Sequence, residues 1–228
     1  MAHVEAGLRS FDLAMPEEIN RMVTDSISDL FFVTEVQGLE NLIKEGKSDD
    51  KIHFVGHVMI DNLFYQLEKL NAMDTAGFPT AAFKQAHKEY GVVTLHRPSN
   101  VDAKETLGAI FSTFNKISEQ LPLIFPIHPR TRKNMEAFGI TPGSGIELTE
   151  PLSYMEFLNL WKDSRVALTD SGGLQEETTA LGIPCLTIRE NTERPITVTQ
   201  GTNELMGNSP GNFSISPGKK TKVSQIQL

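Results

Sequence analysis

The stretch "ALTDSGGLQEE", residues 167–177, runs from an apolar strand through a glycine turn into the start of a helix. In an open α/β sheet, ligands bind beside the carboxyl ends of the strands, where such turns lie. Glycines let the backbone approach a ligand, and the free N–H groups of the first helical turn attract anions. Ser171 and the Gly-Gly pair 172–173 therefore predict a phosphate or diphosphate site, although a plain helix with Ser171 as its N-cap fits the same residues. Glu176 and Glu177 either complement the helix dipole or accept hydrogen bonds from sugar or ribose hydroxyls.

Short apolar runs alternate with helical patterns along the rest of the chain. Six runs rich in aliphatic and aromatic residues predict buried parallel strands: 29–34, 51–56, 91–96, 122–128, 166–170 and 183–188. Apolar residues recur at spacings of three and four in 102–121, which predicts a helix, and shorter helices are predicted at 153–162 and 173–181. Gly182 is expected to end the last of these helices. This alternation predicts an α/β fold with right-handed crossovers.

Residues 71–80 interrupt the alternation with Gly, Pro, Thr and Asp and with little periodicity. We place a domain boundary near this stretch, so that residues 1–66 form one domain and residues 67–228 form another with a divergent tail over 208–228. Only two strands are predicted upstream, too few for a stable parallel sheet covered on both faces. The first domain is therefore expected to be a remnant, and the second a Rossmann-like unit.

Charged and imidazole side chains follow three other predicted strands. A histidine and an arginine occur together in "TLHRPSN" (94–100) and again in "PIHPRT" (126–131), and "ENTERP" (190–195) adds a Glu-Arg pair. Such groups can donate hydrogen bonds to a diphosphate or move a proton, although structural loop histidines fit the pattern equally well. Because parallel strands end at one edge of a sheet, these motifs are expected to converge with the glycine turn on one crevice.

The composition argues against several functional classes. The formal net charge of −8 disfavours binding to nucleic acid or to an anionic membrane. The basic residues Lys219, Lys220 and Lys222 fit a solvated tail. No apolar run approaches the roughly 18 residues that a membrane helix needs, and the first ten residues lack a signal-peptide core. We therefore expect a cytoplasmic protein.

No motif for a metal or a cofactor is present. The six histidines show no zinc-binding spacing, and neither a G-x-G-x-x-G nor a Walker sequence occurs. Cys185 lies in an apolar run and is expected to be a buried small side chain. We expect no metal and no cofactor.

The motifs together resemble the non-hydrolysing UDP-N-acetylglucosamine 2-epimerases. The resemblance rests on "HVEAGLRS" (3–10), "PEEINR" (16–21), "TLHRPSNVD" (94–102), "PIHPRT" (126–131), "TDSGGLQEE" (169–177), "LGIPCLTIRENTERP" (181–195) and "GTNELMG" (201–207). It implies a two-domain, glycosyltransferase-B-like fold with the active site in the cleft between the domains. It also implies a reaction in which UDP is eliminated and then added back, without a cofactor.

The resemblance assigns roles to three candidate catalytic residues. Glu5 and Glu17 match the family's two acid/base carboxylates, and His96 matches its active-site histidine. Elimination needs a base at the sugar C2 and groups that stabilise the departing diphosphate. The two carboxylates suit the first task, and His96 suits the second.

Further residues are expected to bind the UDP-sugar. Ser171, Gly172 and Gly173 match the diphosphate-binding turn, Glu177 matches the carboxylate that holds the ribose hydroxyls, and Arg194 matches an arginine near the phosphates.

Three more binding residues follow from the resemblance. Phe157 lies in the segment that packs on the uracil, whereas Arg97 and His128 match positions that hold a second, regulatory UDP-sugar in some members. His57 departs from the family, whose members usually carry Asn after the glycine of "VGHVMID".

The resemblance begins within the family's N-terminal domain, and the text after Gly207 departs from the family. The chain is therefore expected to be truncated at both ends. We expect a UDP-N-acetylglucosamine 2-epimerase that serves surface polysaccharide synthesis. The alternatives are an inactive UDP-binding fragment, a 2-epimerase of a related UDP-acetamido-sugar, and a glycosyltransferase of the same fold. The family implies a homodimer, and this chain is expected to self-associate.

Overall fold

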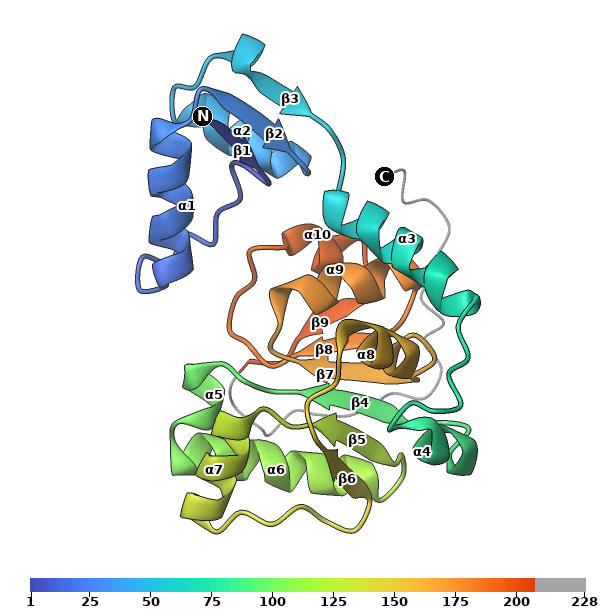
Figure 1. Cartoon of the computed structure of the whole chain (residues 1–228). Coiled ribbons are helices and arrows are strands. Elements are labelled where there is room, and N and C mark those ends of the chain that lie inside the picture. Colours follow the sequence, from blue (N-terminus) through green and yellow to red (C-terminus); the bar gives the residue numbers. More distant parts are fainter. Residues whose placement is uncertain (208–228) are drawn as a thin grey trace.

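The computed structural model describes residues 1–207. The expected divergent tail over 208–228, with its lysine cluster, lies outside the described residues. The described chain forms two parallel sheets, which confirms the predicted α/β class (Figure 1). None of its helices combines the length and the apolar character needed to cross a bilayer.

The first sheet has three strands in the order β1-β2-β3. The strands are β1 (Ala2–Val4), β2 (Leu30–Val33) and β3 (Ile52–Phe54), joined by helices α1 (Pro16–Ile27) and α2 (Val36–Lys44) and by the short 3-10 helix η1 (Asp49–Lys51). Its apolar core is small and consists of Ala6, Phe31, Val33, Leu42 and Ile52, with Leu39 packed against them. We call residues 1–54 the N-terminal lobe.

The second sheet has six strands in the order β6-β5-β4-β7-β8-β9. They are β4 (Gly91–Thr94), β5 (Leu123–Pro126), β6 (Ile146–Thr149), β7 (Val166–Thr169), β8 (Cys185–Thr187) and β9 (Asn203–Leu205). The strand order runs outward in opposite directions from β4 and β7, which are adjacent. Such a reversal creates the crevice in which open α/β sheets bind ligands. The motifs that follow β4 and β7 therefore lie at the topological switch point.

Helices cover both faces of the second sheet. Side chains alternate along each strand, so that Val93 and Phe125 enter one apolar cluster and Val92 and Ile124 enter the other. Helices α6 (Lys104–Ser118) and α7 (Pro129–Phe138) pack on the first cluster, and α3 (Val58–Asn71), α8 (Tyr154–Trp161) and α9 (Gly172–Leu181) pack on the second. The shorter helices are α4 (Ala81–Ala86), α5 (Pro98–Val101) and α10 (Pro195–Thr199). We call residues 58–207 the C-terminal lobe.

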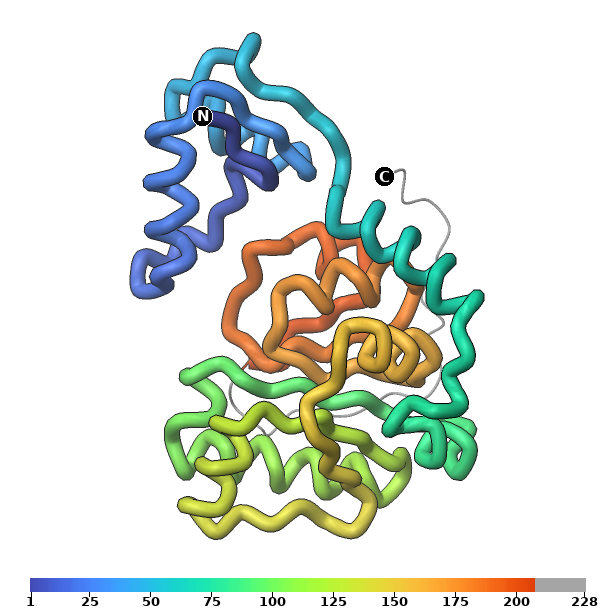
Figure 2. Tube along the Cα trace, in the orientation of Figure 1, coloured from blue at the N-terminus to red at the C-terminus, as the bar shows by residue number. Residues whose placement is uncertain are grey.

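The chain passes between the lobes through residues 55–57 (Figure 2). The domain boundary expected between residues 66 and 67 falls inside α3, whose residues Ile60, Leu63 and Leu70 are buried in the C-terminal lobe. Helix α3 also packs against α8 and α9. This packing favours a junction at the 55–57 connector, and the exact boundary stays a prediction.

The six predicted strands are all present, and three further strands were missed. The missed strands β1, β6 and β9 have three or four residues, as the predicted strands do, but they do not lie in the longer apolar runs on which the prediction rested. Gly182 ends α9 in the left-handed conformation (φ 71°), as predicted. Ser171 occupies the N-cap position of α9, but its side chain makes no capping hydrogen bond there. The alternative interpretation, in which Ser171 serves only to cap the helix, therefore loses its main support.

Candidate active site

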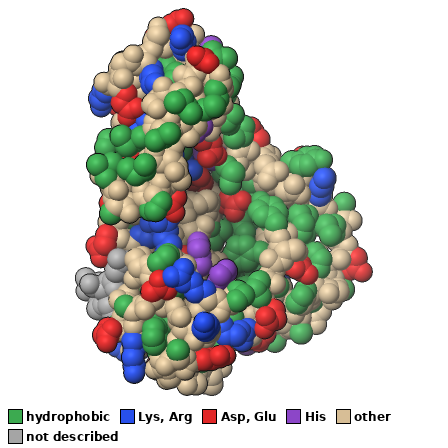
Figure 3. Space-filling view, turned by 60° about the vertical axis from the view of Figure 1, so that its left-hand side comes forward, with side chains coloured by type: hydrophobic (Ala, Val, Ile, Leu, Met, Phe, Trp, Pro, Cys, Tyr) green, Lys and Arg blue, Asp and Glu red, His purple; other side chains and the backbone are tan. Residues whose placement is uncertain are grey.

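The carboxyl ends of the strands of both lobes carry the polar residues that meet between them. Glu5 follows β1, Glu35 lies two residues after β2, and His57 ends the connector after β3. In the C-terminal lobe, Glu176 lies in α9 and Arg194 is the N-cap residue of α10. Figure 3 shows acidic, basic and histidine side chains gathered along a hollow between the upper and lower parts of the molecule. Polar side chains that follow strands of both sheets therefore meet at the junction of the two lobes.

Arg194 is the centre of this cluster. Its Nε lies 3.1 Å from Glu176 Oε1, its Nη2 lies 3.7 Å from Glu5 Oε2, and its Nη1 lies 4.0 Å from Glu35 Oε1. Arg194, Glu176 and Glu35 are buried, whereas the Glu5 side chain is 29% exposed. A single guanidinium is therefore shared by three carboxylates from two lobes.

His57 Nε2 lies 2.5 Å from Glu176 Oε1 and gives the cluster a second cationic group. Burial acts to lower the pKa of His57, but the hydrogen bond and the charge of Glu176 outweigh burial, so the pKa lies above its ordinary value. Burial raises the pKa of Glu35, and the nearby charge of Arg194 offsets only part of that effect. The cluster thus contains a carboxyl group and a histidine whose pKa values both lie above their ordinary values.

Ligand-type atoms of Glu35, His57 and Glu176 lie within 4.8 Å of one another, as a metal site would require. The Arg194 guanidinium contacts the same two carboxylates and already supplies positive charge there. A metal ion would have to share this space with a fixed cation, which Coulomb repulsion opposes at these distances. We assign no metal ligands among these residues.

Asp170 organises the loop that follows β4. Its buried carboxylate accepts hydrogen bonds from the backbone N–H groups of His96 (3.0 Å) and Arg97 (2.8 Å) and from Asn100 Nδ2 (3.2 Å). It also pairs with His96 Nδ1 at 2.9 Å. The structure therefore holds His96 and Arg97 in place from the neighbouring strand, across the switch point. Asp170 was not among the predicted site residues, although it lies in the motif that predicted the turn.

The ion pair between His96 and Asp170 shifts the pKa of both residues. The hydrogen bond to Asp170 raises the pKa of His96, with burial acting in the opposite direction. Burial acts to raise the pKa of Asp170, but its hydrogen bonds and the His96 charge outweigh that effect and hold the pKa below its ordinary value. The raised pKa favours the charged form of His96, whose side chain is 49% exposed.

The glycine turn has a packing reason as well as the proposed binding reason. A Cβ at Gly172 would lie 2.6 Å from Glu193 Oε1, whereas a Cβ at Gly173 would meet only Met59 Cε at 3.9 Å. Glu193 is itself fixed by Arg189 at 2.7 Å, which helps to lower its pKa to about 2 against the opposing effect of burial. Close packing thus accounts for Gly172, and Gly173 leaves room at the start of α9.

Other predicted binding residues line a neighbouring cavity of about 200 Å³. His96, His128 and Phe157 are among its lining residues; the complete lining is Thr94, Leu95, His96, Pro126, His128, Pro151, Leu152 and Phe157. His128 also accepts a hydrogen bond from Arg130 N at 3.2 Å, so it is the side-chain cap of α7. The predicted Glu177 accepts a hydrogen bond from Tyr154 Oη at 3.0 Å at the buried face of α9.

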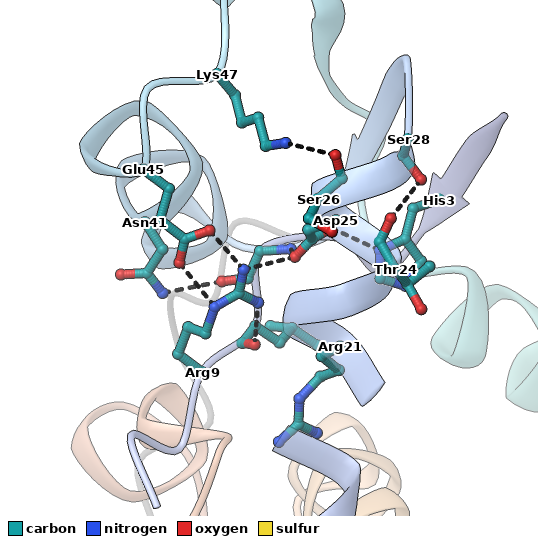
Figure 4. Close-up of polar contacts among 12 residues, drawn as sticks. His3, Arg9, Arg21, Thr24, Asp25, Ser26, Ser28, Asn41, Glu45 and Lys47 are labelled. Carbon is teal, nitrogen blue, oxygen red and sulfur yellow. Dashed lines mark hydrogen bonds and ion pairs between the residues drawn. The ribbon is translucent and has the colours of Figure 1, made fainter. Parts of the chain in front are cut away.

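Glu5 sits in a backbone turn whose neighbouring residues are held in place by other side chains. Figure 4 shows His3, Arg9 and Asp25, which take part in these contacts. The φ of Glu5, 64°, is in the left-handed region, which is uncommon for a residue with a side chain. The Asp25 carboxylate contacts His3 Nδ1 at 2.6 Å and accepts a hydrogen bond from Gly7 N at 3.2 Å, so it joins the residues on both sides of Glu5. Arg9 Nη2 donates to the same carboxylate at 2.7 Å. A buried ion pair therefore fixes a turn whose backbone conformation carries strain.

The two glutamates of the "PEE" motif, Glu17 and Glu18, have different surroundings. Glu18 is fully buried and accepts hydrogen bonds from Ser10 N and Phe11 N, both at 3.0 Å, and from Arg21 Nη2 at 2.7 Å. Glu17 is exposed in the first turn of α1, and within residues 1–207 no hydrogen bond or ion pair joins it to Glu5, His96 or Arg194. Its catalytic role stays a prediction.

Comparisons with known proteins relate this chain to one family. A family model described as UDP-N-acetylglucosamine 2-epimerase matches residues 1–214. A UDP-N-acetylglucosamine 2-epimerase of Methanococcus maripaludis is 42% identical over 220 residues, which are 93% of this chain and 60% of that protein. A UDP-2,3-diacetamido-2,3-dideoxy-D-glucuronate 2-epimerase of Pseudomonas aeruginosa is 38% identical over 210 residues, 91% of this chain and 56% of that protein.

Solved structures show the same relationship. The crystal structure of the Methanocaldococcus jannaschii UDP-GlcNAc 2-epimerase, in complex with UDP-GlcNAc and UDP, matches with a TM-score of 0.83 and 43% identity over 92% of this chain and 59% of that one. This match confirms the expected glycosyltransferase-B-like fold. The chain spans about three fifths of the length of the relatives it matches. It belongs to the UDP-N-acetylglucosamine 2-epimerase family.

Proposed function

We propose that this protein acts in the interconversion of UDP-N-acetylglucosamine and UDP-N-acetylmannosamine, for surface polysaccharide synthesis. The observation that supports the proposal most is the position of Glu5 at the lobe junction. Its carboxylate faces Arg194 at 3.7 Å, in a fold whose solved relative is a complex with UDP-GlcNAc and UDP. A candidate base from one lobe and a cation from the other thereby meet at the lobe junction.

In the proposed reaction, a base removes the proton at the sugar C2. The C2–H electron pair forms a C1=C2 double bond while the C1–O bond breaks, and UDP leaves with that bond's electrons. Adding UDP back at C1 and returning a proton to the other face of C2 gives the epimer. All atoms and electrons are conserved, so the proposal requires neither an oxidant nor a cofactor.

Named residues of this chain suit the separate tasks. We assign proton transfer to Glu5 and Glu17, because carboxylates held near C2 can act as general base and general acid. We assign stabilisation of the departing diphosphate to His96, Arg194 and the N-terminus of α9, which offer cations and free N–H groups.

The test measures substrate binding and turnover separately. We expect the chain to bind UDP-N-acetylglucosamine in the presence of EDTA, as measured by calorimetry. Incubation in D2O with NMR detection is expected to show slow or no deuterium incorporation at C2 and little UDP-N-acetylmannosamine. Turnover is expected once the segments that the relatives carry beyond the matched region are supplied. Absence of binding at millimolar ligand would rule out the proposal.

A second substrate deserves the same assay because of the Pseudomonas aeruginosa relative. That protein is named a 2-epimerase of a UDP-diacetamido-glucuronate and is 38% identical to this chain. A parallel assay with that UDP-sugar separates the two candidates. Faster deuterium incorporation into the diacetamido sugar would assign this chain to the related reaction. Binding of both sugars without any exchange at C2, even in the completed chain, would support an inactive UDP-binding fragment.

We further propose that the protein is a cytoplasmic homodimer. Helix α1 turns its polar residues Glu18 and Asp25 inward and leaves an apolar stripe exposed: Ile19, Met22, Val23 and Ile27, each 41–62% exposed. A stripe at this spacing favours association with another apolar surface. Light scattering at tens of micromolar is expected to show dimers or larger species, and a monomer would contradict this. The buried, unpaired Cys185 fits a reducing compartment.

A further inference from the structure

Glu35 is a carboxylate that lies buried at the lobe junction. It lies at the N-cap position of α2 without capping that helix, and its side chain is 6% exposed. Its Oε1 has no hydrogen-bond partner among the described residues and lies 4.0 Å from Arg194 Nη1. A buried carboxylate of this kind keeps its charge only while a cation compensates it.

The charged groups that face Glu35 come from four places in the fold. Arg194 at α10 and His57 at the start of α3 favour its charged form, whereas Glu176 in α9 and Glu5 after β1 oppose it. His57 is already engaged with Glu176 at 2.5 Å. Arg194 is therefore the main counter-charge of Glu35, and it is shared with the two other carboxylates.

A UDP-sugar would compete for the same guanidinium. Its diphosphate carries two negative charges and offers a better bidentate partner for Arg194 than a carboxylate 4.0 Å away. Once Arg194 turns to the diphosphate, Glu35 is left buried near two other carboxylates and a bound anion. The favourable response of a carboxylate in that environment is to take up a proton.

We propose that Glu35 holds Arg194 in the empty cleft and takes up a proton when the diphosphate of a UDP-sugar replaces it as the partner of Arg194. This inference rests on the proposed function of the cleft and adds a positioning residue that carries the proton linkage. The direction in which UDP-sugar affinity depends on pH follows from this proton uptake. Protonation of Glu35 is easier in the complex than in the free protein, so UDP-sugar affinity rises as the pH falls between the two pKa values and is flat outside them.

Calorimetry with UDP-N-acetylglucosamine tests the inference on the chain as it is. This ligand is suitable because its diphosphate is esterified at both ends, whereas the terminal phosphate of UDP titrates near about pH 6. Titrations between about pH 5 and pH 8, in EDTA and in two buffers of different ionisation enthalpy, give the number of protons taken up. We expect roughly half a proton or more at the maximum, with affinity changing by up to about tenfold per pH unit.

Three variants identify the group that takes up the proton. Glu35→Gln is expected to reduce the uptake to near zero and to tighten binding about fivefold at pH 8, because the competing charge is gone. Glu40→Gln, an exposed position in the same helix α2, is the matched control and is expected to leave both quantities unchanged. His57→Asn is expected to leave most of the uptake in place.

The outcomes separate this inference from the proposed function. No binding at any pH overturns both. Binding without proton uptake, or with uptake that survives Glu35→Gln, overturns the inference alone. Loss of uptake in His57→Asn with retention in Glu35→Gln would also overturn it, because the proton would then belong to the histidine.

Discussion

Glu5→Gln is expected to lower the rate of epimerisation by about 10²- to 10⁴-fold, the usual loss on removing a general base. The amide keeps the size of the side chain in the turn after β1, but it cannot accept the C2 proton. Substrate binding is expected to persist, because the residues assigned to the diphosphate lie in the other lobe. The predicted signature is therefore a fall in kcat with little change in the dissociation constant.

The measurement uses a chimera, because this chain spans 59% of the Methanocaldococcus jannaschii structure. Residues 1–207 are fused to the segments of that protein that lie outside the match, and deuterium exchange at C2 is followed by NMR. Glu17→Gln and His96→Ala are expected to lower the rate as well, and Glu40→Gln serves as an exposed control. A chimera whose Glu5→Gln variant turns over at the unsubstituted rate would refute the assignment of Glu5.

Gly7→Ala is expected to destabilise the N-terminal lobe by about 3 kcal/mol or more, from strain and overpacking together. Gly7 has a φ of 78°, and an added Cβ would lie 2.2 Å from the backbone oxygen of Gly38 and 2.9 Å from Leu42 Cγ. Neither the backbone carbonyl nor the buried leucine can move freely. Urea unfolding followed by far-UV circular dichroism gives the change in the free energy of unfolding.

Gly46→Ala separates the two sources of this cost. Gly46 also has a positive φ, 81°, but an added Cβ there would meet nothing within 4 Å. This control is expected to cost only about 1 kcal/mol, the strain of a left-handed non-glycine residue. Equal effects of the two substitutions would show that the close approach of the Gly7 and Gly38 backbones is unimportant.

The sequence predicts the parts of the fold that have strong local signals. The apolar runs at 91–96 and 166–170 and the periodic helix at 102–121 are found as β4, β7 and α6. Strands β1, β6 and β9 are no shorter than the predicted strands, but they were missed because polar residues interrupt the apolar ones within and around them. Their place in the sheets is decided by pairing with neighbours, as for β9 beside β8.

The part of the candidate site that could be predicted consists of motifs that directly follow strands. His96, Arg97 and the turn at 171–173 follow adjacent strands, and Asp170 links them. The cluster around Arg194 was harder to predict, because Glu35 comes from the other lobe and His57 from the connector, and neither lies in a motif that suggested binding. Buried charged residues that meet only in the folded chain have no recognisable pattern in the sequence around them. The one hint was His57, which stands where family members usually carry Asn.

The Asp25 contacts described above have a consequence for how the protein is made. The shape of the Glu5 turn is imposed by a residue 18 to 22 positions further along the chain. A synthetic peptide of residues 1–15 should therefore not hold the turn, and a nascent chain cannot form it until α1 has left the ribosome. The Glu5 turn is therefore completed only when a later segment of the chain, α1, docks on it.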